Sequence, residues 1–138
     1  MRKMAEIVKN PKPVTLPPSA TVEAACRAMR DRRVGSVLVI AEGGGVIGIF
    51  TGRDAVHRVL AEGKSATRTR LHEVMTPEPL TIAADRPAIE ALRLMEDARC
   101  RHLPVVHQGR LAGIVSRYDF NGIEIDRLDE EIGLWERL

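Results

Sequence analysis

The feature that most constrains this chain is an internal repeat. The segment Gly48-Ile49-Phe50-Thr51-Gly52-Arg53-Asp54 returns as Gly113-Ile114-Val115-Ser116-Arg117-Tyr118-Asp119. Upstream of this motif, matched residues such as Ala25 and Ala91 lie 66 positions apart, and the spacing drops to 65 at the motif because the first copy has a longer glycine loop. Agreement over roughly 50 residues with one insertion indicates that one structural unit is built twice.

Both copies predict the same order of elements, β-α-β-β-α, in a mixed α/β (α+β) fold. In the first copy these are a short strand at 14–16, a helix that starts after Ser19 or Thr21 and ends at Gly35, strands at 36–41 and 46–50, and a helix at 51–61. In the second copy they are a strand at 80–82, a helix at 87–98, and strands at 102–106 and 110–115. The residues of the 51–61 helix expected to face inward are Ala55, Val56, Val59 and Leu60.

The same patterns divide the chain into four segments. The two repeats are expected at 4–63 and 71–125, joined by a polar, basic surface linker at 64–70. The tail at 126–138 is amphipathic, with a helix break expected at Gly133. Its Trp135 could pack on the repeats or on another subunit.

Composition excludes several classes of protein. Of the 138 residues, 44% are hydrophobic and 29% are charged, as in a folded soluble protein. Aromatic residues make up only 3% and the net charge is +2, which argues against direct binding of nucleic acid. No run approaches the roughly 18 apolar residues of a membrane helix. Cys26 and Cys100 form no Cys-x-x-Cys pair, so we expect buried thiols in a reducing cytoplasm.

Each repeated motif places a hydroxyl three residues before a carboxylate at a helix start, as Thr51 with Asp54 and as Ser116 with Asp119. One interpretation is structural, since such a pair forms a capping box. The other is a ligand site, because free N–H groups at the helix start favour phosphate and a carboxylate can accept two hydrogen bonds from the vicinal hydroxyls of a ribose. Both interpretations stay open at this point.

These motifs, together with Arg101-His102-Leu103-Pro104-Val105-Val106, resemble the CBS domain, and the tandem resembles a CBS pair or Bateman module. The resemblance implies two repeats packed sheet to sheet with pseudo-twofold symmetry and two clefts between them. It also implies a disc-shaped homodimer, and clefts that take AMP, ADP, ATP or S-adenosylmethionine. By the same resemblance, Asp54 and Asp119 contact ribose, and Thr51 and Ser116 lie near phosphate.

Further candidate ligand residues follow from their places in the repeats. Arg101 and His102 could contact phosphate, or they could simply interact favourably with the dipole at the C-terminal end of a helix. The remaining candidates are basic residues beside the motif acids, Arg53 and Arg117, and residues along the expected clefts, Val14, Thr15, Gly35, Ser36, Leu80 and Thr81. Core packing explains the apolar ones equally well.

No catalytic motif and no metal-ligand spacing is present in the sequence. The leading hypothesis is therefore a non-catalytic, cytoplasmic regulatory sensor that binds an adenosyl ligand, requires no cofactor or metal, and signals by a change of conformation to a protein partner. The alternative hypothesis is a dimeric interaction scaffold that binds no small molecule.

Overall fold

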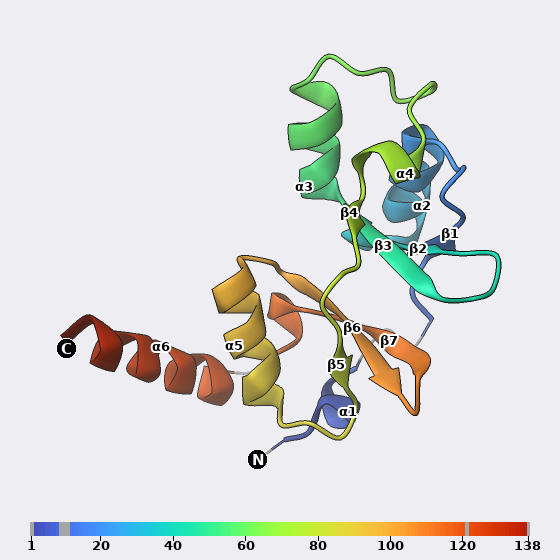
Figure 1. Cartoon of the computed structure of the whole chain (residues 1–138). Helices are drawn as coiled ribbons and strands as arrows, with labels where there is room; N and C mark the ends of the chain where they lie inside the picture. Colours follow the sequence, from blue (N-terminus) through green and yellow to red (C-terminus); the bar gives the residue numbers. More distant parts are fainter. Residues whose placement is uncertain (1, 9–11, 121, 138) are drawn as a thin grey trace. The chain divides into compact units, whose positions relative to one another are not determined.

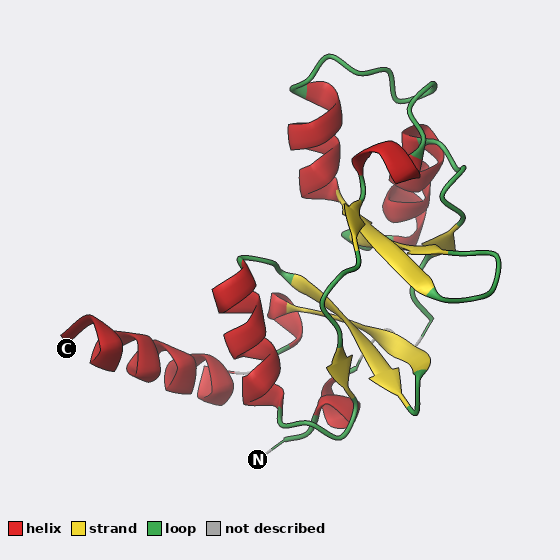
Figure 2. Cartoon of the chain, in the orientation of Figure 1, coloured by secondary structure: helices red, strands yellow, loops and turns green. Residues whose placement is uncertain are grey.

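A computed structural model describes residues 2–8, 12–120 and 122–137, and its contacts divide the chain into two compact units. The first-repeat unit is Pro13–Pro79, and the second-repeat unit is Met1–Lys12 together with Leu80–Leu138. Figure 1 shows the elements of both units in chain order, and Figure 2 shows that each combines helices with β-strands. The predicted mixed α+β class is confirmed, whereas the packing of sheet on sheet stays a prediction.

The first-repeat unit holds a four-stranded sheet in the order β1-β2-β3-β4. Its elements are β1 (Thr15–Leu16), α2 (Val22–Arg32), β2 (Ser36–Ile40), β3 (Val46–Thr51), α3 (Gly52–Asp54), the π-helix η1 (Ala55–Leu60), α4 (Leu71–Val74) and β4 (Thr76–Pro77). Strand β1 runs parallel to β2, and α2 connects them. Val37, Leu38 and Val39 are all fully buried, so β2 is covered on both faces, as its continuous apolar run predicts.

The second-repeat unit holds a three-stranded sheet in the order β5-β6-β7, with β5 parallel to β6. Its elements are α1 (Met4–Ile7), β5 (Ile82–Ala83), α5 (Ala88–Ala98), β6 (His102–His107), β7 (Arg110–Ser116), the 3-10 helix η2 (Arg117–Asp119) and α6 (Gly122–Arg137). The turn between β6 and β7 has positive φ at both Gln108 and Gly109. That conformation matches the twist of a two-residue hairpin.

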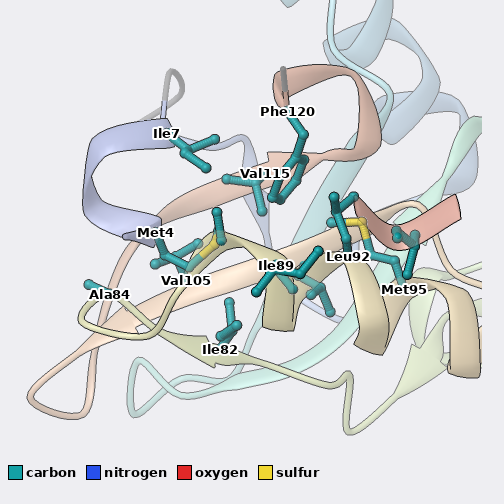
Figure 3. Close-up of a cluster of buried hydrophobic side chains, with 14 residues drawn as sticks. Met4, Ile7, Ile82, Ala84, Ile89, Leu92, Met95, Val105, Val115 and Phe120 are labelled. Carbon is teal, nitrogen blue, oxygen red and sulfur yellow. The ribbon is translucent and has the colours of Figure 1, made fainter. Parts of the chain in front are cut away.

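The short helices α1 and α4 each complete the unit of the other repeat. Met4 and Ile7 of α1 are buried in the core cluster formed by α5, β6 and β7, as Figure 3 shows. Leu71 and Val74 of α4 are buried with the core of the first-repeat unit. The compact units therefore do not follow the repeat boundaries read from the sequence, 4–63 and 71–125, because each core needs a helix from beyond its own repeat.

The N-terminal segment contacts the rest of the second-repeat unit through backbone and side-chain hydrogen bonds. The Met4 amide donates to the Arg86 carbonyl at 2.9 Å, and the Ala88 amide donates to the Arg2 carbonyl at 2.8 Å. The Arg2 guanidinium donates two hydrogen bonds of 2.7 Å to the buried carboxylate of Glu124. This bidentate pair joins the first residues of the chain to α6.

The segment at 64–70 is more than the surface linker that its polar composition predicts. The Thr69 carbonyl accepts from the Val22 amide at 2.9 Å, and the Ala66 carbonyl accepts from the Glu23 amide at 3.0 Å. Because the first turn of α2 has no partners within the helix, these carbonyls satisfy it. Thr69 is accordingly buried and Ala66 is half-buried, while the other residues of the segment are exposed.

Two predicted features of the helices need correction. Helix α2 ends at Arg32 rather than at Gly35, and its C-cap residue Arg33 has a left-handed φ of 53°. On η1, Val56 and Leu60 are 53% and 70% exposed, and only Val59 is fully buried. The i→i+5 bonding of this π-helix widens its turn, so fewer side chains face the core than an α-helix would present.

Helix α6 runs without a break through Gly133 to Arg137, so the expected interruption there is wrong. Leu128 is buried against the core of the second-repeat unit. Arg93 of α5 donates to Glu131 at 2.9 Å and 2.5 Å, and these bonds hold the pKa of Glu131 below its ordinary value. The side chain of Trp135 lies outside the described residues. No helix in the described ranges is long and apolar enough to cross a membrane.

Gly48, the first residue of the repeated motif, lies where β3 pairs with β4. A Cβ atom at this position would lie 2.3 Å from Met75 Sδ and 2.9 Å from Met75 Cγ. Strand pairing and the Met75 side chain together therefore explain why this position in the first copy is a glycine.

We expect Gly48→Ala to lower the free energy of unfolding by about 1–3 kcal/mol, because Met75 must leave its packed position. Adding Met75→Ala to that variant should remove the clash. The double variant should therefore lose less free energy of unfolding than the two single variants lose in total. Urea unfolding of the three variants measures this coupling. A Gly48→Ala protein as stable as wild type would contradict the close contact.

Candidate functional site

The sheet of the first-repeat unit brings its candidate residues to one corner. Ser36, the first residue of β2, pairs with Thr51, the last residue of β3. The Gly52 amide donates to the Gly35 carbonyl at 3.1 Å, which fixes the chain as it turns into α3. We call Gly35, Ser36, Thr51 and Asp54 the first-copy corner.

A capping box closes this corner. The Asp54 amide donates to Thr51 Oγ1 at 3.2 Å, and the Thr51 amide donates to Asp54 Oδ2 at 2.9 Å. The other carboxylate oxygen, Asp54 Oδ1, lies 3.7 Å from Arg58 Nε. Arg58 Nη1 in turn donates to the Val74 carbonyl of α4 at 3.2 Å. Arg58 is not among the site residues predicted from the sequence, although its i,i+4 spacing from Asp54 is a signal for such a contact.

The second-repeat unit repeats this corner with different side chains. His102 pairs with Ser116, and the Arg117 amide donates to the Arg101 carbonyl at 3.0 Å. The Ser116 amide donates to Asp119 Oδ2 at 2.8 Å, and Ser116 Oγ lies 3.5 Å from the same oxygen. We call Arg101, His102, Ser116 and Asp119 the second-copy corner.

Several amides at the helix starts already donate within the chain. In the first copy these are the amides of Thr51, Gly52 and Asp54. In the second copy they are the amides of Ser116 and Arg117. These five donors are therefore not available to an anion, and phosphate at the helix starts stays a prediction.

The basic candidates differ in their surroundings. Arg53 and Arg101 are exposed, and His102 is half-buried at the start of β6. Arg117 forms an ion pair with Glu96 of α5, with Nη1 and Oε2 3.3 Å apart. Arg117 thus contributes to holding η2 near α5, and its charge is partly offset.

The candidates along β1 and β5 show where the copies diverge. Val14 is buried, and its carbonyl accepts from the Leu38 amide at 2.9 Å. Thr15 is an exposed residue of β1. Leu80 and Thr81 are exposed and precede β5, so the strand predicted at 80–82 begins too early.

This difference has a local cause. Leu38 corresponds to Pro104 in the second copy, and proline has no amide N–H to donate to a neighbouring strand. Pairing of β5 with β6 is therefore confined to Ile82 with Val105 and Ala83 with Val106.

The described residues hold no group of three His, Cys, Asp or Glu side chains that could bind a metal ion. Cys26 and Cys100 are free and half-buried rather than fully buried. Burial raises the pKa of both thiols, which keeps them in the less reactive protonated form.

The family model for the CBS domain matches residues 5–61 and 71–122. The chain belongs to the CBS-domain family. The matched segments contain both repeated motifs and both corners, and the resemblance drawn from those motifs is confirmed. CBS domains are regulatory modules.

Relatives with this domain differ in length. The CBS domain-containing protein CBSCBSPB3 of Arabidopsis thaliana is 38% identical over 104 residues, which is 75% of this chain but 19% of that protein. The chain thus spans about a fifth of the length of the Arabidopsis protein it matches.

Two solved structures match nearly the whole chain. A putative signal-transduction protein with CBS domains from Burkholderia ambifaria is 28% identical, with a TM-score of 0.81 over 92% of this chain and 93% of that one. The CBS domain protein PAE2072 from Pyrobaculum aerophilum, complexed with AMP, is 25% identical, with a TM-score of 0.83 over 94% of this chain and 99% of that one.

Proposed function

We propose that this CBS-domain chain is a non-catalytic sensor that binds an adenosyl ligand, AMP, ADP, ATP or S-adenosylmethionine, and passes the binding state to a protein partner. The observation that carries the proposal is the occurrence of a hydroxyl and a carboxylate side by side at the same corner of both units. Each carboxylate uses one oxygen, Oδ2, for its own backbone. The second oxygen is the group that would accept hydrogen bonds from a ribose.

The likeness to PAE2072, which was solved with AMP, supports an adenine nucleotide as the ligand class. Exposed Arg53 and Arg101 would supply the positive charge that a phosphate needs. Binding would shift the equilibrium between conformations only as far as the ligand prefers one of them, which is how such a module would signal.

A thermal-shift panel of AMP, ADP, ATP, S-adenosylmethionine and NAD tests this proposal. A ligand at a hundred times its dissociation constant should add roughly 2.7 kcal/mol of stability and raise the melting temperature. The double variant Asp54→Asn/Asp119→Asn should lose that increase. Asparagine can still accept the capping hydrogen bond, so this change removes the charge and spares the helix starts.

Glu73→Gln is the matched control, because Glu73 also caps a helix start, accepting from the Arg70 amide at 2.6 Å. It should keep the full ligand-induced shift. If none of the five compounds changes the melting temperature, or if the double variant responds like wild type, the proposal is wrong.

A second candidate function is a dimeric interaction scaffold, and the exposed apolar side chains of η1 favour it. Val56 and Leu60 point away from the core of their own unit, and a second copy of this chain would cover them. We expect light scattering to give the mass of a dimer for the wild type and a smaller mass for Leu60→Glu. A wild-type monomer at micromolar concentration would contradict this function, and a nucleotide-induced shift would favour the sensor.

A further inference from the structure

We propose that the two corners bind nucleotide with unequal strength, because Arg58 forms an ion pair with the second carboxylate oxygen of Asp54, whereas Asp119 has no such ion pair among the described residues. The inference rests on the proposed function and adds to it an order of occupancy. The second-copy corner would bind nucleotide tightly. The first-copy corner would bind it more weakly, because Arg58 competes with the ligand for Asp54.

Both carboxylate oxygens of Asp54 have partners within the chain. Its Oδ2 accepts from the Thr51 amide, and its Oδ1 lies 3.7 Å from Arg58 Nε. The Asp54 side chain is only 17% exposed, so a ribose hydroxyl that approaches Oδ1 would compete with the guanidinium. The hydrogen bond from Arg58 to the Val74 carbonyl keeps that guanidinium in place.

The contacts of Asp119 differ from those of Asp54. Within the described part of the chain, the Asp119 carboxylate accepts hydrogen bonds from the amide and the hydroxyl of Ser116, both at Oδ2. The position that corresponds to Arg58, 65 residues later, is Ile123, which carries no charge. The nearest basic residue in sequence, Arg117, is paired with Glu96.

The side chains at the starts of β2 and β6 also favour phosphate binding at the second-copy corner. The first copy has Gly35 and Ser36 where the second has Arg101 and His102. A guanidinium and an imidazole can both donate hydrogen bonds to phosphate, whereas glycine offers no side chain. The second-copy corner therefore combines the Asp119 carboxylate with the side chains of Arg101 and His102. At the first-copy corner the basic residue beside the motif acid is Arg53, and Asp54 is already in contact with Arg58.

The expected size of the difference follows from the strength of the Arg58–Asp54 pair. A ligand must replace the contribution of this partly exposed ion pair before it gains affinity. Removing the competitor should therefore tighten binding at the first-copy corner by up to about fivefold. The second-copy corner should not change, since the contacts of Arg58 are with Asp54 and the Val74 carbonyl.

Equilibrium dialysis with radiolabelled AMP, ADP and ATP, each used alone, tests the inference on the full chain. For the wild type we expect two classes of site. Asp119→Asn should remove the tight class, and Asp54→Asn should remove only the weak one. Arg58→Gln should tighten the weak class by up to about fivefold, because glutamine can still donate to the Val74 carbonyl but carries no charge.

Arg27→Gln is the matched control. Arg27 pairs with Glu23 across one turn of α2, so the variant loses the same charge from an i,i+4 ion pair that includes no corner residue, and it should bind like wild type. Melting curves of every variant establish that each one is folded.

The outcomes separate this inference from the function on which it rests. If nucleotide binds but Asp54→Asn removes the tight class, or if Arg58→Gln weakens binding or leaves it unchanged, the inference is wrong and the sensor function stands. A chain that binds S-adenosylmethionine and no phosphate-bearing nucleotide also overturns the inference alone. If no adenosyl compound binds at all, both proposals fall.

Discussion

Ile7→Ala is expected to loosen residues 80–138 and to leave residues 13–79 protected, although Ile7 belongs to the first repeat in sequence. Ile7 is buried in the core of the second-repeat unit, and removing its outer methyl groups leaves a cavity there. The cost should be about 2–5 kcal/mol in the free energy of unfolding. Native-state hydrogen exchange would show which amides lose protection.

Val74→Ala is the matched control, since Val74 holds the place in α4 that Ile7 holds in α1. It should loosen residues 13–79 instead, with a smaller effect because fewer atoms are removed. If Ile7→Ala lowered protection mainly in residues 13–79, the exchange of short helices between the repeats would be wrong.

Arg2→Ala is expected to lower the free energy of unfolding by more than the loss of a surface ion pair does. The variant loses two charge-assisted hydrogen bonds to Glu124, whose side chain is only 8% exposed. The Arg2 side chain is 34% exposed, so the cost should lie below that of a fully buried pair. Urea unfolding followed by circular dichroism measures the change.

Arg86→Ala provides a comparison with nearly the same geometry. Arg86 donates two hydrogen bonds to Glu90 at 2.7 Å and 2.6 Å, but both side chains are on the surface. Its removal should cost less than about 1 kcal/mol, because water replaces the lost contacts. Equal losses in the two variants would mean that the burial of Glu124 does not set the strength of its pair with Arg2.

The repeated motifs illustrate how far local patterns reach. The pairing of Thr51 with Asp54 could be predicted, because a capping box forms between residues three positions apart. The turn at Gln108 and Gly109 was equally predictable, since it lies between two apolar strands. The structure shows the capping interpretation directly, and the ligand interpretation stays a proposal that uses the other carboxylate oxygen.

Two other predictions were wrong because they used local sequence patterns alone. The inward face assigned to Val56 and Leu60 assumed an α-helix, whereas the segment adopts a π-helix with a different face. The early start assigned to β5 ignored that Pro104, on the neighbouring strand, cannot donate the hydrogen bond that Leu38 donates in the first copy.

By itself, the sequence determined the duplication, the order of elements and the two hydroxyl–carboxylate junctions, because these depend on periodicity and on residues a few positions apart. Only the tertiary structure decided that α1 completes the second-repeat unit, that Arg2 meets Glu124, and that Arg58 is held between Asp54 and the Val74 carbonyl. Such contacts join residues far apart in the chain, and their geometry is set by which buried faces pack together.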